Sequence, residues 1–273
     1  MRKVSRFGAM VLLVAACGGG TEGIALVANT QQTLTPGPNR LLMAIASEED
    51  GTFLSTPNVP TKARFLFDGE EVAEVDTRWV WAIPEVRGFL VANVDLTAPG
   101  RWEVVLEPQG SSPTPPTPFG VQASSTVPAV GDPAISVATR THPEYPLEEI
   151  SSDADPDPRL HHLSLDDALA NGNPTVVAFA TPAFCTTASC GPTLDVVRSI
   201  MDSYPDVNWI HVEIYADLDA AAGGSLEAVP AVEAWGLPSE PWVFVIDASG
   251  VVTARYEGAV GRDELTDAVE NLG

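Results

Sequence analysis

Apolar and polar positions alternate with a period of two over the first part of the chain, which predicts short β-strands. The alternation is clearest in residues 61–69, where Ala63 and Phe65 alternate with Lys62 and Arg64 before an Asp-Gly turn signal. The predicted strands are 40–46, 61–69, 71–83, 88–96 and 100–108. Because no helical stretch interrupts strands at this spacing, residues 24–107 are predicted to form an immunoglobulin-like β-sandwich, an all-β domain.

From residue 160 onward the pattern changes to helical segments that alternate with short, continuous apolar runs. Ser164 and the acids that follow it resemble a capping box, which predicts a helix start. The further predicted elements are a strand at 175–180, a helix at 192–204, strands at 207–215, 242–247 and 251–257, and a helix at 262–272. This alternation predicts a second domain of α/β class over residues 160–273.

The residues between the two domains, 108–159, have the composition of a linker. Five prolines lie in 108–118, and six acids with no base lie in 144–157. The spacing of Asp153, Asp155 and Asp157 suggests a calcium loop, but Pro158 and Ser164 occupy the positions where such a loop needs glycine and glutamate. We therefore expect a solvated, Pro-rich and acidic linker without a metal.

The N-terminal residues have the features of a secretory signal peptide. Three basic residues precede an apolar run at 9–16, which is too short to span a bilayer. Val14-Ala15-Ala16-Cys17 resembles the lipobox of bacterial lipoproteins. The resemblance implies a signal peptide at 1–16, a lipid on Cys17, a tether at 17–23, and anchoring to the extracytoplasmic face of a bacterial cell membrane, periplasmic or cell-surface. An ordinary cleaved signal with a coincidental cysteine is the alternative.

The charge of the chain argues against nucleic acid as a partner. There are 14 basic and 37 acidic residues, a formal net charge of −23, whereas nucleic-acid binding requires clustered Lys and Arg. Removal of residues 1–16 takes away three basic residues, so the mature charge is 11 − 37 = −26. A lipid, rather than surface charge, would have to hold such a body at an anionic membrane.

The chain has three cysteines, of which Cys185 and Cys190 lie in the loop between a predicted strand and a predicted helix. A helix N-terminus there would stabilise a thiolate. Together with Pro241 before a later strand, this order of elements resembles the thioredoxin superfamily. The resemblance implies that Cys185 attacks, that Cys190 resolves the mixed disulfide, and that a cis Pro241 faces the sulfur and guides the substrate. It implies no cofactor.

The spacing departs from the family pattern, because four residues separate the cysteines where thioredoxins have two. Five residues of unbroken helix rise about 7.5 Å, beyond the reach of a disulfide. Either Cys185 precedes the helix, or the first turn unwinds when the bond forms. The hydroxyls of Thr186 and Thr187 are candidates to cap a helix that starts after them.

Two other branches of the superfamily have related cysteine spacings. The spacing is similar to that of peroxiredoxins of the bacterioferritin-comigratory type, with Thr181-Pro182 upstream, but one extra residue precedes Cys185 and the family's arginine is missing. Copper chaperones of cytochrome oxidase use a shorter Cys spacing. We expect His211 to be an ordinary strand residue, and His161-His162 to lie on a solvated approach to the domain, so no metal site is predicted.

These features predict a membrane-anchored, extracytoplasmic thiol–disulfide oxidoreductase that acts through Cys185 and Cys190 on partner proteins with thiols or disulfides. A thiol peroxidase of peroxiredoxin type is one alternative. Another is a non-catalytic binding or assembly lipoprotein, in which the thioredoxin-like domain is vestigial and the cysteine pair is an inert staple.

Overall fold

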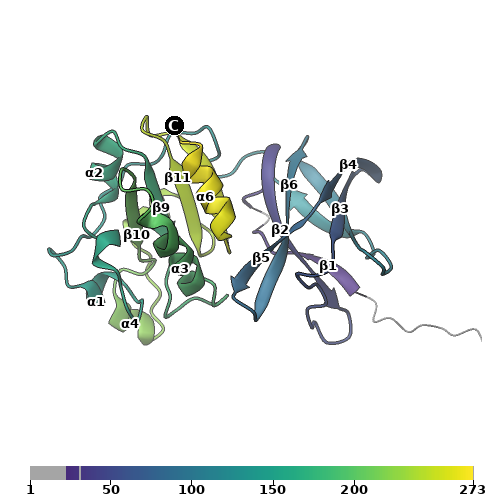
Figure 1. The fold of residues 1–273 in the computed structure, drawn as a ribbon, viewed down its shortest axis with the longest axis horizontal. Helices are drawn as coiled ribbons and strands as arrows, with labels where there is room; N and C mark the ends of the chain where they lie inside the picture. Colours follow the sequence, from purple (N-terminus) through teal and green to yellow (C-terminus); the bar gives the residue numbers. More distant parts are fainter. Residues whose placement is uncertain (1–22, 31, 273) are drawn as a thin grey trace, which may run out of the picture.

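The computed structural model describes residues 23–30 and 32–272, which form two domains that lie side by side (Figure 1). The predicted signal peptide at 1–16, the predicted lipid site Cys17 and all of the tether except its last residue lie outside the described residues. Among the helices that are described, none is long and apolar enough to cross a membrane.

The first domain is a β-sandwich of two four-stranded sheets, in which all neighbouring strands are antiparallel. One sheet has the order β1 (Gly23–Val27), β2 (Gly37–Ser47), β6 (Arg87–Leu96), β5 (Arg78–Ile83), and the other β4 (Glu70–Asp76), β3 (Thr61–Phe67), β7 (Gly100–Pro108), β8 (Thr117–Val121). Apolar side chains of both sheets meet between them, among them Leu41, Met43, Phe65 and Trp102. Burial of this shared face stabilises the domain.

The strands of the sandwich differ from the sequence prediction at β1, which was not predicted, and in two further places. The predicted strand 71–83 is two strands in different sheets, because Thr77 turns the chain: its N–H and its hydroxyl both donate to the Thr61 carbonyl, at 3.0 and 2.8 Å. The strand β8 lies within the predicted linker. It is an edge strand, where the missing N–H of Pro118 costs no ladder hydrogen bond.

The rest of the predicted linker packs on the second domain. Val127 is buried in the core of that domain, and Pro133 forms a β-bridge with Val251. Two short helices follow, α1 (Leu147–Ile150) and η1 (Pro158–Leu160). The acidic run is also fixed, because Asp153 accepts a 2.7 Å bond from Arg198. The prediction of a free linker was therefore wrong for these segments: β8 joins the sandwich, Val127 and Ile150 are buried, and Asp153 pairs with Arg198.

The second domain is a mixed sheet with helices on both faces. The strand order is β10 (Asn208–Val212), β9 (Thr175–Phe179), β11 (Trp242–Ile246), β12 (Val252–Glu257), with β10 parallel to β9 and the other pairs antiparallel. One core contains residues of α3 (Cys190–Met201) and α6 (Arg262–Glu270), and the other contains residues of α2 (Leu165–Ala170) and α5 (Pro230–Ala234). A further short helix is α4 (Leu218–Ala222).

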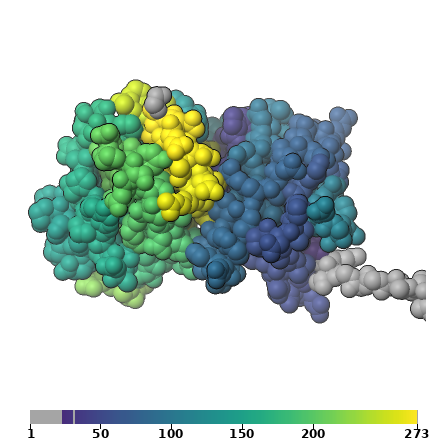
Figure 2. All heavy atoms as spheres, viewed as in Figure 1, coloured from purple at the N-terminus to yellow at the C-terminus, as the bar shows by residue number. Residues whose placement is uncertain are grey.

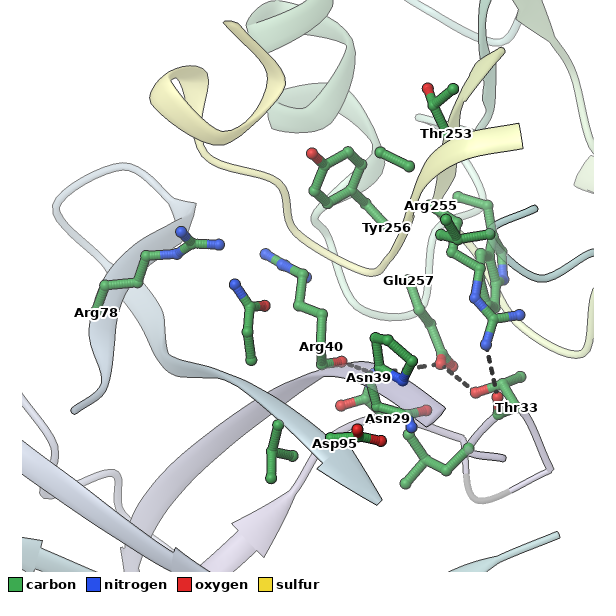
Figure 3. Close-up of a pocket in the computed structure, with 17 residues that line it drawn as sticks. Asn29, Thr33, Asn39, Arg40, Arg78, Asp95, Thr253, Arg255, Tyr256 and Glu257 are labelled. Carbon is green, nitrogen blue, oxygen red and sulfur yellow. Dashed lines mark hydrogen bonds between the residues drawn. The ribbon is translucent and has the colours of Figure 1, made fainter. Parts of the chain in front are cut away.

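The two domains meet through buried charged groups together with a small apolar cluster, in which Leu42, Val80, Ala82 and Val91 of the sandwich pack with Ala259. Figure 2 shows α6 packed directly against the sandwich. Glu264 of α6 binds Arg40 of β2 through two bonds, at 2.7 and 2.8 Å, and also binds Arg78 of β5. Glu257 at the end of β12 accepts a 2.7 Å bond from Thr33 of the sandwich. Arg40 and Arg78 reach toward each other beside a cavity of about 440 Å³ between the domains (Figure 3).

Candidate active site

Cys185 and Cys190 form a disulfide in the loop that follows β9, with their Cα atoms 6.0 Å apart. The helix α3 begins at Cys190, so Cys185 lies outside it. The structure thus selects the first of the two arrangements that the spacing allowed, in which the attacking cysteine precedes the helix. Cys185 is only partly buried, whereas Cys190 is fully buried. Cys185 is therefore the sulfur that another molecule can reach.

The Cys185 sulfur accepts hydrogen bonds that would also stabilise a thiolate. The backbone N–H of Cys190, in the first turn of α3, lies 3.3 Å from Sγ, and the Thr187 hydroxyl lies at the same distance. Thr187 also bonds Ser189, which is the N-cap residue of α3 but makes no side-chain cap bond. The prediction that Thr186 or Thr187 caps the helix was wrong, because the Thr187 hydroxyl is engaged by the sulfur and by Ser189.

The loop before β11 lies beside the cysteine loop. The Glu240–Pro241 peptide bond is cis, as predicted for this position. The Thr186 backbone hydrogen-bonds to the Glu240 carboxylate. Burial raises the pKa of Glu240, and this bond offsets the rise only in part. Pro241 thus stands one residue from a direct contact with the cysteine loop, while its role in guiding a substrate stays a prediction.

The mixed sheet, the cysteine pair ahead of α3 and the cis proline ahead of β11 together match the arrangement that the sequence resemblance implied. The C-terminal domain therefore has a thioredoxin-like fold. No protein-family model matches the chain, and no curated protein matches it.

Several solved structures match parts of this chain at low sequence identity. A thiol:disulfide interchange protein of the thioredoxin family from Chlorobium tepidum is 18% identical, with a TM-score of 0.34 over 54% of this chain and 100% of its own. MTB DsbF is 22% identical, with a TM-score of 0.33 over 41% of this chain and 90% of its own. The Lin-41 filamin domain is 14% identical, with a TM-score of 0.23 over 37% of this chain and 93% of its own.

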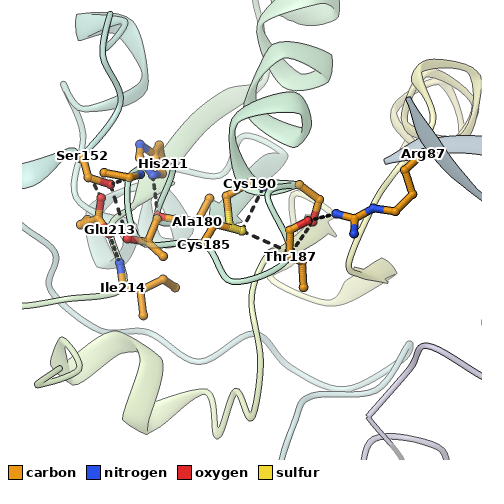
Figure 4. The surroundings of a disulfide bond; sticks show 12 residues. Arg87, Ser152, Ala180, Cys185, Thr187, Cys190, His211, Glu213 and Ile214 are labelled. Carbon is orange, nitrogen blue, oxygen red and sulfur yellow. Dashed lines mark hydrogen bonds between the residues drawn. A yellow bond between two sulfur atoms is a disulfide. The ribbon is translucent and has the colours of Figure 1, made fainter. Parts of the chain in front are cut away.

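A cluster of buried polar side chains lies on the opposite side of the cysteine pair from Arg87 (Figure 4). His211 of β10 approaches His161 at 3.3 Å and the Ala180 carbonyl at 3.0 Å. The carboxylate of Glu213 accepts a 2.8 Å bond from the Ser152 N–H. Ser152 in turn accepts a 3.2 Å bond from the Ala183 N–H of the cysteine loop. This cluster joins the acidic segment to the loop that holds Cys185.

Both buried histidines are held in their neutral form. Burial, and then the neighbouring His211, lower the pKa of His161 to about 3, and burial likewise lowers the pKa of His211. If the His211 Nε2–H donates to Ala180, its Nδ1 accepts from the Nε2–H of His161, which requires the His211 ring to be neutral. The prediction that His161 is solvated was wrong: it is 2% exposed, while His162 is exposed as predicted.

The neutral pair predicts that the protein loses stability as the pH falls from 7 to 5. Unfolded histidines gain protons near pH 6.5, whereas the folded ones stay neutral to lower pH, so His161 alone favours the unfolded state by about 2 kcal/mol at pH 5, and His211 acts in the same direction. Denaturant unfolding of His161→Asn at both pH values should show a smaller loss than the natural chain. His162→Asn is the matched control, and an equal loss in the two variants would contradict this account.

Sequence reasoning missed three contacts of the site. Arg87 of the sandwich and Glu240 contact the cysteine loop from other parts of the chain, and Thr187 contacts the Cys185 sulfur from within the loop. Closeness in sequence to Pro241 and to Cys185 could have suggested Glu240 and Thr187, whereas no sequence feature indicates Arg87. Within residues 23–30 and 32–272, no three His, Cys, Asp or Glu side chains gather in a way that could hold a metal ion.

Proposed function

We propose that this chain is an extracytoplasmic thiol–disulfide oxidoreductase that exchanges its Cys185–Cys190 disulfide with thiols or disulfides of partner proteins. The observation that carries the proposal is the asymmetry of the pair: a half-buried Cys185 and a fully buried Cys190 at the first position of α3. An accessible sulfur can be attacked or can attack, while a buried one can act only within the molecule.

In the reducing direction, the Cys185 thiolate attacks one sulfur of a partner disulfide. The partner's sulfur–sulfur bond breaks as the new bond to Cys185 forms, and one partner thiolate leaves and takes a proton from water. Cys190 then loses its proton and attacks the Cys185 sulfur, which releases the second partner thiol. Two electrons pass to the partner, whose disulfide becomes two thiols while Cys185 and Cys190 become a disulfide. The oxidising direction is the reverse.

Two features of the site support this chemistry. The Cys190 N–H and the Thr187 hydroxyl both point at the Cys185 sulfur, and each can hydrogen-bond a thiolate more strongly than a thiol. The loop before β11, with cis Pro241, lies against the same loop, and we propose that an extended partner segment binds beside it. The named solved structures include proteins described as thiol:disulfide interchange proteins.

We further propose that Cys17 carries a lipid which holds the protein on the extracytoplasmic face of a bacterial membrane, and that residues 17–23 are the tether. The lipobox-like Val14-Ala15-Ala16-Cys17 supports this part of the proposal. We also propose that the sandwich is an immunoglobulin-like domain. One sheet contains β1, β2, β5 and β6 and the other contains β3, β4, β7 and β8, a division typical of that class.

The proposed activity can be tested by reduction of a disulfide-bonded model peptide in the presence of dithiothreitol. The natural chain should accelerate the reaction, and Cys185→Ser should reduce the rate about 10³-fold or to background. Equal, negligible rates for both chains would overturn the proposal. Consumption of hydrogen peroxide that depends on Cys185, without peptide reduction, would instead support the peroxidase.

A further inference from the structure

A side chain of the sandwich reaches the cysteine loop of the other domain. The hairpin between β5 and β6 turns at Glu85, which has φ of +60°, and Val86 closes it with a 3.0 Å bond to the Ile83 carbonyl. Arg87 follows, and its Nη2 donates a hydrogen bond to the Thr187 carbonyl (Figure 4). The two residues are 100 positions apart in sequence, so this contact exists only when the domains are docked.

Thr187 is also the residue whose hydroxyl touches the Cys185 sulfur. One residue thus connects Arg87, through its carbonyl, with the sulfur at 3.3 Å and with Ser189 at 2.7 Å. The next residue, Ala188, has φ of +57°, a backbone conformation that residues other than glycine rarely adopt. A loop in this conformation needs contacts from outside itself to hold it, and Arg87 supplies one of them.

The charge of Arg87 is free to act on the site. Across residues 23–30 and 32–272, Arg87 forms no salt bridge, although the chain has a net charge of −23. The other groups that face the cysteine loop are the N-terminus of α3, the Glu240 carboxylate from the loop before β11, and Tyr215, whose ring contacts that of Phe184 at 5.9 Å. Glu240 disfavours a thiolate at Cys185, whereas Arg87 favours it.

We propose that Arg87 is a positioning residue of the redox site, through which the sandwich holds Thr187 against the Cys185 sulfur and places a cation beside the thiolate that forms on reduction. The inference rests on the proposed redox function and assigns the sandwich a part in it. A sandwich that acted only as a spacer would not change the chemistry of the cysteine pair.

The test is a pH titration of Cys185 in the reduced full-length chain, read as the rate of iodoacetamide alkylation of the Cys185 peptide by mass spectrometry. In Arg87→Met the titration should move to higher pH by about half a unit or more, because the thiolate loses a nearby cation. Arg87→Lys should restore part of the shift. Arg101→Met, a change of an exposed sandwich arginine, should leave the titration unchanged.

The equilibrium of the cysteine pair with glutathione gives a second readout. With a less stable thiolate, Arg87→Met should favour the disulfide about threefold or more over the natural chain. If Arg87→Met folds poorly, Arg87→Gln is the substitute: it keeps a hydrogen-bond donor but removes the charge, so it should also move the titration to higher pH. An unchanged titration in a folded Arg87→Met or in a folded Arg87→Gln would overturn the inference. Neither readout needs a turnover substrate, so a failed activity assay would be a separate result.

Discussion

Cys190→Ser is expected to trap a disulfide-bonded model peptide as a stable covalent adduct on Cys185. The reason is that Cys185 is the accessible sulfur, and that the thiol which would release the peptide is Cys190, whose Cα lies 6.0 Å from that of Cys185. Mass spectrometry of the intact chain should show a one-to-one adduct that disappears with dithiothreitol. The natural chain should show little adduct, because resolution within the molecule follows quickly.

The matched control for this experiment is Cys185→Ser, which keeps the other cysteine of the pair. Cys190 is 0% exposed, so this variant should form no adduct in its folded state. Equal adduct formation in the two variants, or adduct on Cys190 alone, would contradict the assigned roles. Adduct on Cys17 is distinguished by its own peptide, because that residue is far from the pair in sequence.

Glu264→Ala is expected to destabilise the protein strongly, by about 3–5 kcal/mol, because it leaves a buried cation without its partner. The side chains of Arg40 and Glu264 are 9% and 4% exposed, and Arg78 shares the same carboxylate. Burial acts to raise the pKa of Glu264, but the hydrogen bond and charge of Arg40, the Gly261 N–H and the charge of Arg78 together outweigh burial and lower the pKa. The carboxylate is therefore charged at neutral pH and holds both domains.

Denaturant unfolding at pH 7 measures this effect, with Asp263→Ala as the control. Asp263 precedes Glu264 in the first turn of α6 and is exposed, so its removal should cost well under 1 kcal/mol. A two-step unfolding curve in Glu264→Ala, with one step in the natural chain, would show that the domains have separated. Equal stabilities of the two variants would contradict the importance of this interface.

Most strands and the longer helices could be predicted from the sequence, because their apolar periodicity reflects burial on one sheet or helix face. The continuous run at 175–180 and the period-two pattern at 61–69 both became strands within two residues of their predicted bounds. The break at Thr77 could not be predicted, since the alternation continues through it while the chain changes sheet. Its cause is a hydrogen bond to Thr61, a contact with no local pattern.

The candidate site was predicted in part, for a similar reason. The disulfide loop and the cis bond before Pro241 follow from neighbouring residues and from the family resemblance. Arg87 and the buried His161 could not be found, because what places them is the docking of distant segments. An Arg in a hairpin and a His in a polar stretch have the sequence features of surface residues, because the domain or strand that covers each of them is distant along the chain.

The central claim is that Cys185 and Cys190 are a redox pair rather than a structural staple. The most direct measurement equilibrates the folded full-length chain with graded ratios of reduced and oxidised glutathione, and follows alkylation of the two cysteines by mass spectrometry together with the fold by circular dichroism. We predict a reversible two-electron transition at which the fold is retained and Cys185 is alkylated before Cys190. A pair that is reduced only when the chain unfolds would contradict the account.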